Sequence, residues 1–144
     1  MKRARKSECL TEADILKALA LRSGMHVAEI GPARFPDAIE RAVSPHGRVY
    51  TANTSLPLDL PEHCCDRVLM ANVWNETTDI KAVLHEAARI LCHDGRLVVI
   101  ESRIPFDDVL RTLEHNSFDV HRHGDAGAQC YFIEAAVSDQ SVQS

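Results

Sequence analysis

Apolar residues recur along this chain with two different periods. After residue 79 they follow the spacing of an amphipathic helix, at Ile80, Val83, Leu84, Ala87, Ala88 and Leu91, because side chains three and four positions apart share one helix face. The run RLVVIES at 96–102 is instead almost continuously apolar, which is typical of a parallel strand buried on both faces. Together the two patterns predict helices packed against a central sheet.

The other segments extend this alternation over the whole chain. Helices are predicted over 12–21, 36–44, 80–91 and 106–116, and strands over 25–30, 48–53, 67–73, 96–102, 118–124 and 129–137. Thr11 is the expected N-cap of the first helix, and Thr78 or Asp79 that of the third. The proline-rich segment 54–66 is expected to be irregular. GDAG at 124–127 is expected to join the last two strands as an antiparallel hairpin.

This order of elements predicts an α/β fold with a doubly wound sheet. About six strands are expected, mostly parallel with one antiparallel strand. No repeat or linker divides the sequence, so residues 1–144 are predicted to form one domain with flexible tails at 1–9 and 138–144. Because ligands of such sheets bind beyond the carboxyl ends of the strands, the loop that begins at Gly31 is the expected ligand site.

Charge and cysteine content exclude several classes of function. The chain has 16 Lys and Arg against 21 Asp and Glu, a net charge of −5, which argues against a general binder of nucleic acid or anionic membranes. The basic start MKRARKSE is not followed by a signal-length apolar run, and no segment is apolar enough to span a bilayer. Five cysteines without framework spacing favour reduced thiols in a cytoplasmic protein.

The class I S-adenosylmethionine-dependent methyltransferases resemble this chain in three stretches: GMHVAEIGPA at 24–33, LPEHCCDRVLMANVWNE at 60–76 and AVLHEAARILCHDGRLVVIES at 82–102. The likeness is nearest the small-molecule branch that includes the quinone-biosynthesis methyltransferases, and it covers about residues 10–137. It implies a three-layer, Rossmann-like fold and S-adenosylmethionine as cofactor. It also implies that one helix–strand unit of the family is missing after Ser55.

The resemblance assigns cofactor roles residue by residue. Glu29 and Gly31 match the family's acidic residue and first glycine, whereas Ala33 and Phe35 stand where its second and third glycines would be. Asn53 replaces the acidic residue that holds the ribose hydroxyls, and as a neutral partner it forms weaker hydrogen bonds than a carboxylate does.

Further positions complete the expected site. Asp59 is a partial substitute for the acidic residue of the missing unit, and Arg34 offers a positive charge to the cofactor's carboxylate. Asn72 is a cofactor candidate at the end of the third strand, and the residues after it face the substrate in the family: Trp74, Asn75 and Glu76. The alternative for Trp74 is packing, with the asparagines capping the next helix.

Two hypotheses stand for Phe35. Its benzyl group needs about 150–250 Å² of covering surface, and either the cofactor cavity or the protein core can supply it. Pro32 and Pro36 lack an N–H, so two donors are absent from the loop.

A second candidate site combines HCCD at 63–66 with Cys92-His93, which lie before strands at the opposite edge of the sheet. Soft-metal or zinc binding is chemically reasonable there, but the spacing matches no zinc pattern. Cys65 is better interpreted as a small core residue, so no metal is expected.

Two functions remain open. The first is a methyltransferase-like domain with a degenerate S-adenosylmethionine site, serving as a non-catalytic binding, scaffold or regulatory module. The second is a minimal active methyltransferase acting on a small molecule, whose reaction needs positioning more than acid–base groups. The missing unit is expected to expose a sheet edge, which favours a homodimer or a partner protein there.

Overall fold

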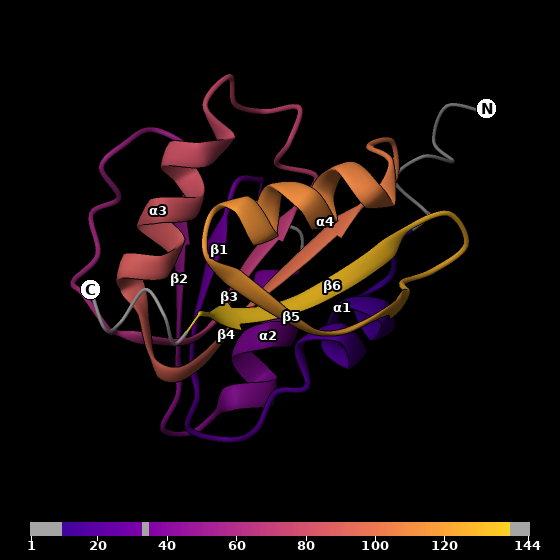
Figure 1. Cartoon of the computed structure of the whole chain (residues 1–144). Coiled ribbons are helices and arrows are strands. Elements are labelled where there is room, and N and C mark those ends of the chain that lie inside the picture. The colour runs from indigo at the N-terminus through magenta and orange to yellow at the C-terminus, as the bar shows by residue number, and fades with distance from the viewer. Residues whose placement is uncertain (1–9, 33–34, 139–144) are drawn as a thin grey trace.

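The computed structural model describes residues 10–32 and 35–138. Over this part of the chain it contains one six-stranded sheet in the order β2-β1-β3-β4-β6-β5 (Figure 1). Strands β1 to β4 are mutually parallel, and β6 runs antiparallel to both β4 and β5. The predicted doubly wound sheet with one antiparallel strand is confirmed. The predicted tails at 1–9 and 138–144 lie outside the described residues, except for Ser138.

The helices and strands alternate as the apolar pattern predicts. The helices are α1 (Glu12–Leu19), α2 (Pro36–Val43), α3 (Ile80–Ile90) and α4 (Phe106–His115). The strands are β1 (His26–Ile30), β2 (Arg48–Ala52), β3 (Cys65–Ala71), β4 (Leu91–Glu101), β5 (Phe118–Asp125) and β6 (Tyr131–Val137). Thr11 caps α1 in a reciprocal capping box with Asp14, and Asp79 caps α3 by accepting a hydrogen bond from the Ala82 N–H.

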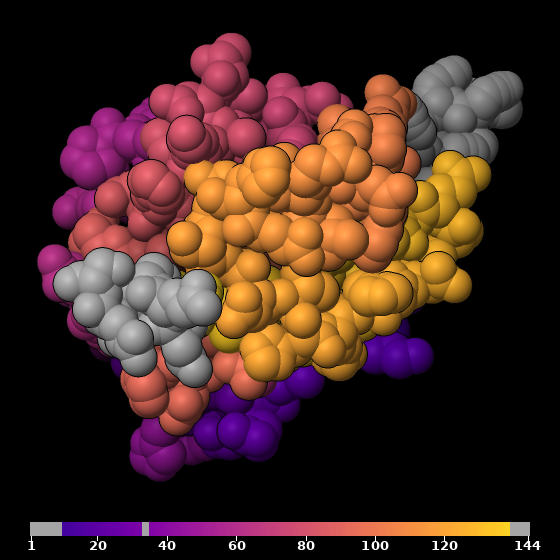
Figure 2. Space-filling view, in the orientation of Figure 1, coloured from indigo at the N-terminus to yellow at the C-terminus, as the bar shows by residue number. Residues whose placement is uncertain are grey.

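Two apolar clusters cover the two faces of the sheet. One lies under α3 and α4, and the other lies under α1 and α2 (Figure 1). Adjacent residues of the central strand β4 belong to opposite clusters, for example Val98 and Val99, because successive side chains of a strand point to opposite faces. The three-layer arrangement follows from this burial. In space-filling view, α4 and β5 make up the centre of the near face (Figure 2).

Two strand boundaries differ from the sequence expectation. β3 begins at Cys65, inside the segment expected to be irregular. β4 begins at Leu91, the last residue of the helix predicted over 80–91, and so starts before the strand predicted over 96–102. The reason is long-range: Cys65 pairs with Leu91 across the sheet, and the register then shifts before Arg67 pairs with Arg96. The residues between these two pairs therefore form an irregularity within the β3–β4 pairing rather than a separate turn.

The chain after β2 takes a short route to β3. Residues 53–64 contain no helix or strand and connect the carboxyl end of β2 directly with the start of β3. Within the described part of the chain β2 pairs with β1 alone, so its other side is an edge of the sheet. This connection occupies the place where the sequence resemblance implies a missing helix–strand unit.

Candidate functional site

Gly31 makes the turn at the carboxyl end of β1. Its φ of 101° is in the left-handed region, and its N–H donates to the Ala52 carbonyl at 2.7 Å. A Cβ at this position would lie 2.8 Å from Cγ2 of Val73. Glycine is therefore required here by both the backbone conformation and the contact with the loop after β3.

Two other predicted cofactor residues lie on the strands next to this turn. Glu29 is in β1, where only 2% of its surface is exposed. Asn72 follows β3 with a φ of 59° and donates its N–H to the Ile100 carbonyl at 2.8 Å. The sheet thus brings Glu29, Gly31 and Asn72 to the carboxyl ends of the neighbouring strands β1 and β3.

Phe35 packs against the core. It precedes α2, is half-buried, and lies against the cluster under α1 and α2. It is not among the residues that line the hollow beside β2. The placement favours core packing over filling of that hollow. Ala33 and Arg34, the other two predicted residues of this loop, lie outside the described residues.

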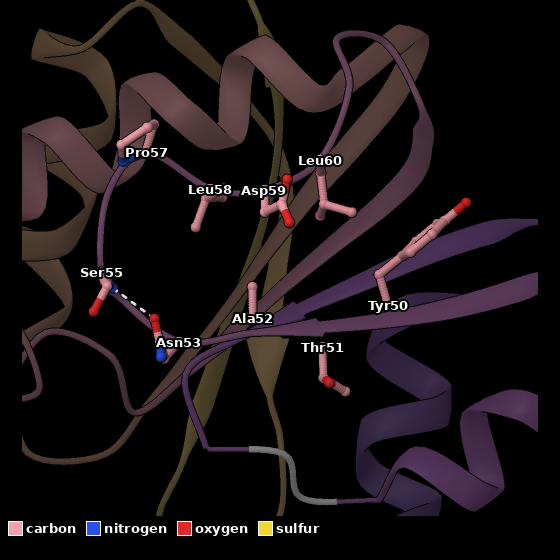
Figure 3. A pocket seen from close by; sticks show the side chains of 9 residues that line it. All are labelled: Tyr50, Thr51, Ala52, Asn53, Ser55, Pro57, Leu58, Asp59 and Leu60. Carbon is pink, nitrogen blue, oxygen red and sulfur yellow. Dashed lines mark hydrogen bonds between the residues drawn. The ribbon is translucent and has the colours of Figure 1, made fainter.

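A hollow of about 490 Å³ lies between β2 and the connection that follows it (Figure 3). Its volume is within the usual range for small-molecule pockets. Leu58, Asp59 and Leu60 on the connection face Ala52 and Tyr50 on β2. The lining residues are Tyr50, Thr51, Ala52, Asn53, Ser55, Pro57, Leu58, Asp59 and Leu60. Two predicted cofactor residues, Asn53 and Asp59, therefore share one pocket.

The Asn53 side chain is engaged locally. Its Oδ1 accepts a hydrogen bond from the Ser55 N–H at 2.8 Å (Figure 3). This contact spans two residues and is an Asx turn, which stabilises the change of direction at the end of β2. One acceptor lone pair and the NH₂ group remain to contact a ligand, and the site lacks a negative charge at this strand end.

The expected substrate-facing segment is held by a buried acid. The Trp74 N–H donates to Oε2 of Glu101 at 3.0 Å, and Glu101 is 1% exposed. Burial raises the pKa of Glu101, and hydrogen bonds from the Trp74 and Val73 backbones oppose that shift. Trp74 itself is half-buried against the cluster under α3 and α4, whereas Asn75 and Glu76 are exposed.

Glu101 did not emerge from the sequence as a site residue. The signal that could have found it is an acidic residue at the end of a continuously apolar strand. A carboxylate in that position must be hydrogen-bonded when buried.

Of the three cysteines beside β3 and β4, Cys65 is a small core residue, whereas Cys64 and Cys92 are half-buried. Cys64 and Cys65 place their sulfurs 3.4 Å apart, and Cys92 Sγ lies 3.5 Å from Oδ1 of Asp66. Burial raises the pKa of the Cys65 and Cys92 thiols, a shift that disfavours the thiolate form. Cys64, Cys65 and Cys92 are free thiols. Among the described residues no group of three or more His, Cys, Asp or Glu side chains is arranged to hold a metal ion.

Comparisons with known proteins agree with this architecture. Residues 34–99 match a family model described as a methyltransferase domain. A search of the curated proteins found no match. None of the helices in the described residues is both long enough and apolar enough to cross a membrane.

Several solved structures share the fold. A SAM-dependent methyltransferase from Aquifex aeolicus is 18% identical with a TM-score of 0.73, over 90% of this chain and 91% of that one. The pyocyanin biosynthetic protein PhzM is also 18% identical, with a TM-score of 0.76, over 94% of this chain and 56% of that one, so this chain spans just over half of its length. The [4+2]-cyclase SpnF has a TM-score of 0.65 at 15% identity, over 82% of this chain and 60% of that one.

At these identities the structural likeness establishes the fold alone. The match to the family model adds a similarity in sequence over residues 34–99. The mostly parallel sheet and the antiparallel β6 are the architecture that the three sequence stretches imply. The six-stranded sheet and the solved structures that share it show that this chain has a Rossmann-like methyltransferase fold, and its residues 34–99 match the methyltransferase-domain model.

Proposed function

We propose that this protein is a methyltransferase-like binding module whose S-adenosylmethionine site is degenerate and which does not transfer methyl groups. The observation that carries the proposal is the chemistry of the residue that follows β2. There the neutral amide of Asn53 replaces the expected carboxylate, and its Oδ1 already accepts a hydrogen bond from Ser55 at 2.8 Å.

The size of the effect supports weak binding. A hydrogen bond to a charged group contributes about 1.5–3 kcal/mol, against about 0.5–1.5 kcal/mol between neutral groups. Replacing a carboxylate that holds two ribose hydroxyls therefore weakens binding by about 1–3 kcal/mol, or roughly fivefold to 150-fold. The short connection 53–64 reduces the adenine side of the site further, because a helix and a strand are replaced by one loop.

The second candidate is a minimal active methyltransferase acting on a small molecule. Two retained features favour it: the buried Glu29 in β1 and the glycine turn at Gly31. The Aquifex aeolicus protein of the same fold is described as a SAM-dependent methyltransferase. SpnF is described as a cyclase, so this fold also supports other chemistry and does not by itself decide between the candidates.

Calorimetric titration with S-adenosylmethionine and S-adenosylhomocysteine separates the two. A ligand at 100 times its Kd adds about 2.7 kcal/mol to the free energy of unfolding, so thermal denaturation provides an independent readout. We expect a Kd far above the micromolar range for both ligands. Low-micromolar binding would show that the site is intact and would favour the active enzyme.

We also propose that a second copy or a partner protein pairs with the outer edge of β2. An exposed edge strand presents unpaired backbone N–H and C=O groups that favour association. Light scattering across a concentration series tests this: a mass corresponding to more than one chain is expected, and a monomer at the highest concentration argues against it. Residence in the cytoplasm stays a prediction from the cysteine content.

A further inference from the structure

Helix α3 carries an acid–base pair that points toward the connection 53–64. Arg89 donates from Nε to Oε2 of Glu86 at 3.0 Å and from Nη2 to Oε1 at 2.9 Å. The two side chains are 29% and 19% exposed. Two parallel hydrogen bonds between a guanidinium and a carboxylate fix both groups more firmly than a single contact does.

Both members of the pair bind the same peptide segment. The Leu58 N–H donates to Oε1 of Glu86 at 2.9 Å, and the Leu58 carbonyl accepts from Nη2 of Arg89 at 3.0 Å. Leu58 is 5% exposed and packs into the cluster under α3 and α4. The Glu86–Arg89 pair thus satisfies the backbone donor and acceptor of a buried residue that belongs to no helix or strand.

The same helix anchors the end of the connection. The His63 N–H donates to the Arg89 carbonyl at 2.9 Å, and Nδ1 of His63 lies 3.1 Å from the Leu91 carbonyl. The segment between Leu58 and His63 is therefore tied at both ends to the last turn of α3 and the start of β4. It includes Asp59 and Leu60, which face β2 across the hollow.

We propose that Glu86 and Arg89 are positioning residues for the hollow beside β2. Neither lines it. They act through Leu58, because its fixed backbone determines the positions of Asp59 and Leu60. The loop can therefore form the wall of the hollow that a helix–strand unit would otherwise form. The proposal deepens the proposed function and rests on it, since it takes the ligand of the module to be a small molecule of the adenosine type.

The experiment uses the full chain, isotope-labelled for NMR, with adenosine as the probe. Arg89→Lys keeps the positive charge but loses the planar fork, so one of its contacts to Glu86 and Leu58 must be lost. Glu86→Gln keeps one acceptor and serves as the conservative partner. Arg111→Lys is the matched control, because Arg111 pairs with Asp108 at the same spacing on α4, at 3.8 Å and in an exposed position.

Two readouts are taken for each variant: the hydrogen-exchange rate of the Leu58 amide and the adenosine Kd from shifts of the Asp59 and Leu60 amides. We expect faster exchange and an adenosine Kd about tenfold higher in Arg89→Lys, the equivalent of one charge-assisted hydrogen bond. We expect a smaller change of the same kind in Glu86→Gln and none in the control. Arg89→Lys is expected to lower the urea midpoint more than Arg111→Lys does, because Arg89 bonds the buried Leu58 backbone. The adenosine Kd is therefore measured without urea, where both variants are folded, which separates positioning from general loss of stability.

Three results would overturn the positioning role. One is unchanged Leu58 exchange in Arg89→Lys, and another is faster exchange with an unchanged adenosine Kd. The third is the absence of any adenosine-dependent shift at Asp59 and Leu60 in the unmodified protein, which would leave no ligand for the wall to position. None of these contradicts a non-catalytic module, whereas tight S-adenosylmethionine binding with methyl transfer contradicts the proposed function and leaves the positioning role standing.

Discussion

Glu101 holds the backbone of Trp74. The carboxylate at the end of β4 accepts the Trp74 N–H at 3.0 Å, joining the end of one central strand to the loop that follows its neighbour β3. That loop contains the residues expected to face a substrate. Since Glu101 is buried, the contact couples the order of this loop to the protonation state of an internal acid.

Replacing Glu101 by Gln should change how stability depends on pH. Burial raises the pKa of Glu101 above its ordinary value of 4.5 in the folded state. The stability that this group contributes is therefore fully present below about pH 4.5 and is lost as pH rises through the folded-state pKa. Glu101→Gln keeps an acceptor for Trp74 without titrating, so its free energy of unfolding relative to the unmodified protein should increase with pH and then level off.

Urea denaturation between pH 4 and pH 8 measures this difference. Glu62→Gln, at an exposed position, controls for the removal of one negative charge. A difference between Glu101→Gln and the unmodified protein that stays constant over the whole range would contradict the prediction.

Gly31→Ala should destabilise the fold more than Gly24→Ala does. Both glycines have a positive φ, 101° and 93°, but an added Cβ meets Val73 at 2.8 Å at the first position and nothing within 4 Å at the second. Backbone strain costs about 1–2 kcal/mol at each, and overpacking adds about 1–3 kcal/mol at Gly31 alone. Chemical denaturation of both variants tests the ordering, and equal losses would show that the contact with Val73 relaxes freely.

Asn53→Asp should strengthen binding of S-adenosylmethionine. An aspartate can still accept the Ser55 N–H that Asn53 binds at 2.8 Å, so the turn is kept while a charge is restored at the end of β2. We expect the Kd to fall about tenfold, the effect of making one hydrogen bond charge-assisted. Calorimetry measures it, with Asp59→Asn as the reverse change on the opposite wall. An unchanged Kd would show that the weak binding of the cofactor has another cause, the short connection 53–64.

Phe35→Ala should lower stability without improving cofactor binding. Phe35 is half-buried against the cluster under α1 and α2. Full burial would make the substitution cost about 3–5 kcal/mol, so about 2 kcal/mol is expected here, and Phe35→Leu should recover most of it. A gain in affinity for S-adenosylmethionine in Phe35→Ala would revive the hypothesis that this ring fills the cofactor cavity.

Periodicity predicted the fold because burial imposes different periods on helices and strands. The spacing of Ile80, Val83 and Leu84 is that of the buried face of α3, and the uninterrupted run Val98–Ile100 belongs to a strand covered by helices on both sides. The boundaries at Cys65 and Leu91 were wrong because those residues pair with each other across the sheet. A window of neighbouring residues carries no information on a partner 26 positions away.

The site divides in the same way. Sequence alone determined the chemistry at the strand ends: the turn glycine, the buried acid in β1, and the amide where the family has a carboxylate. Tertiary structure decided which groups meet. It placed Phe35 against the cluster under α1 and α2, brought Asn53 and Asp59 to the lining of one hollow, and set the Glu86–Arg89 pair against Leu58. The sequence gives the chemical type of each residue directly, whereas contacts between distant segments depend on how the sheet and helices bring those segments together.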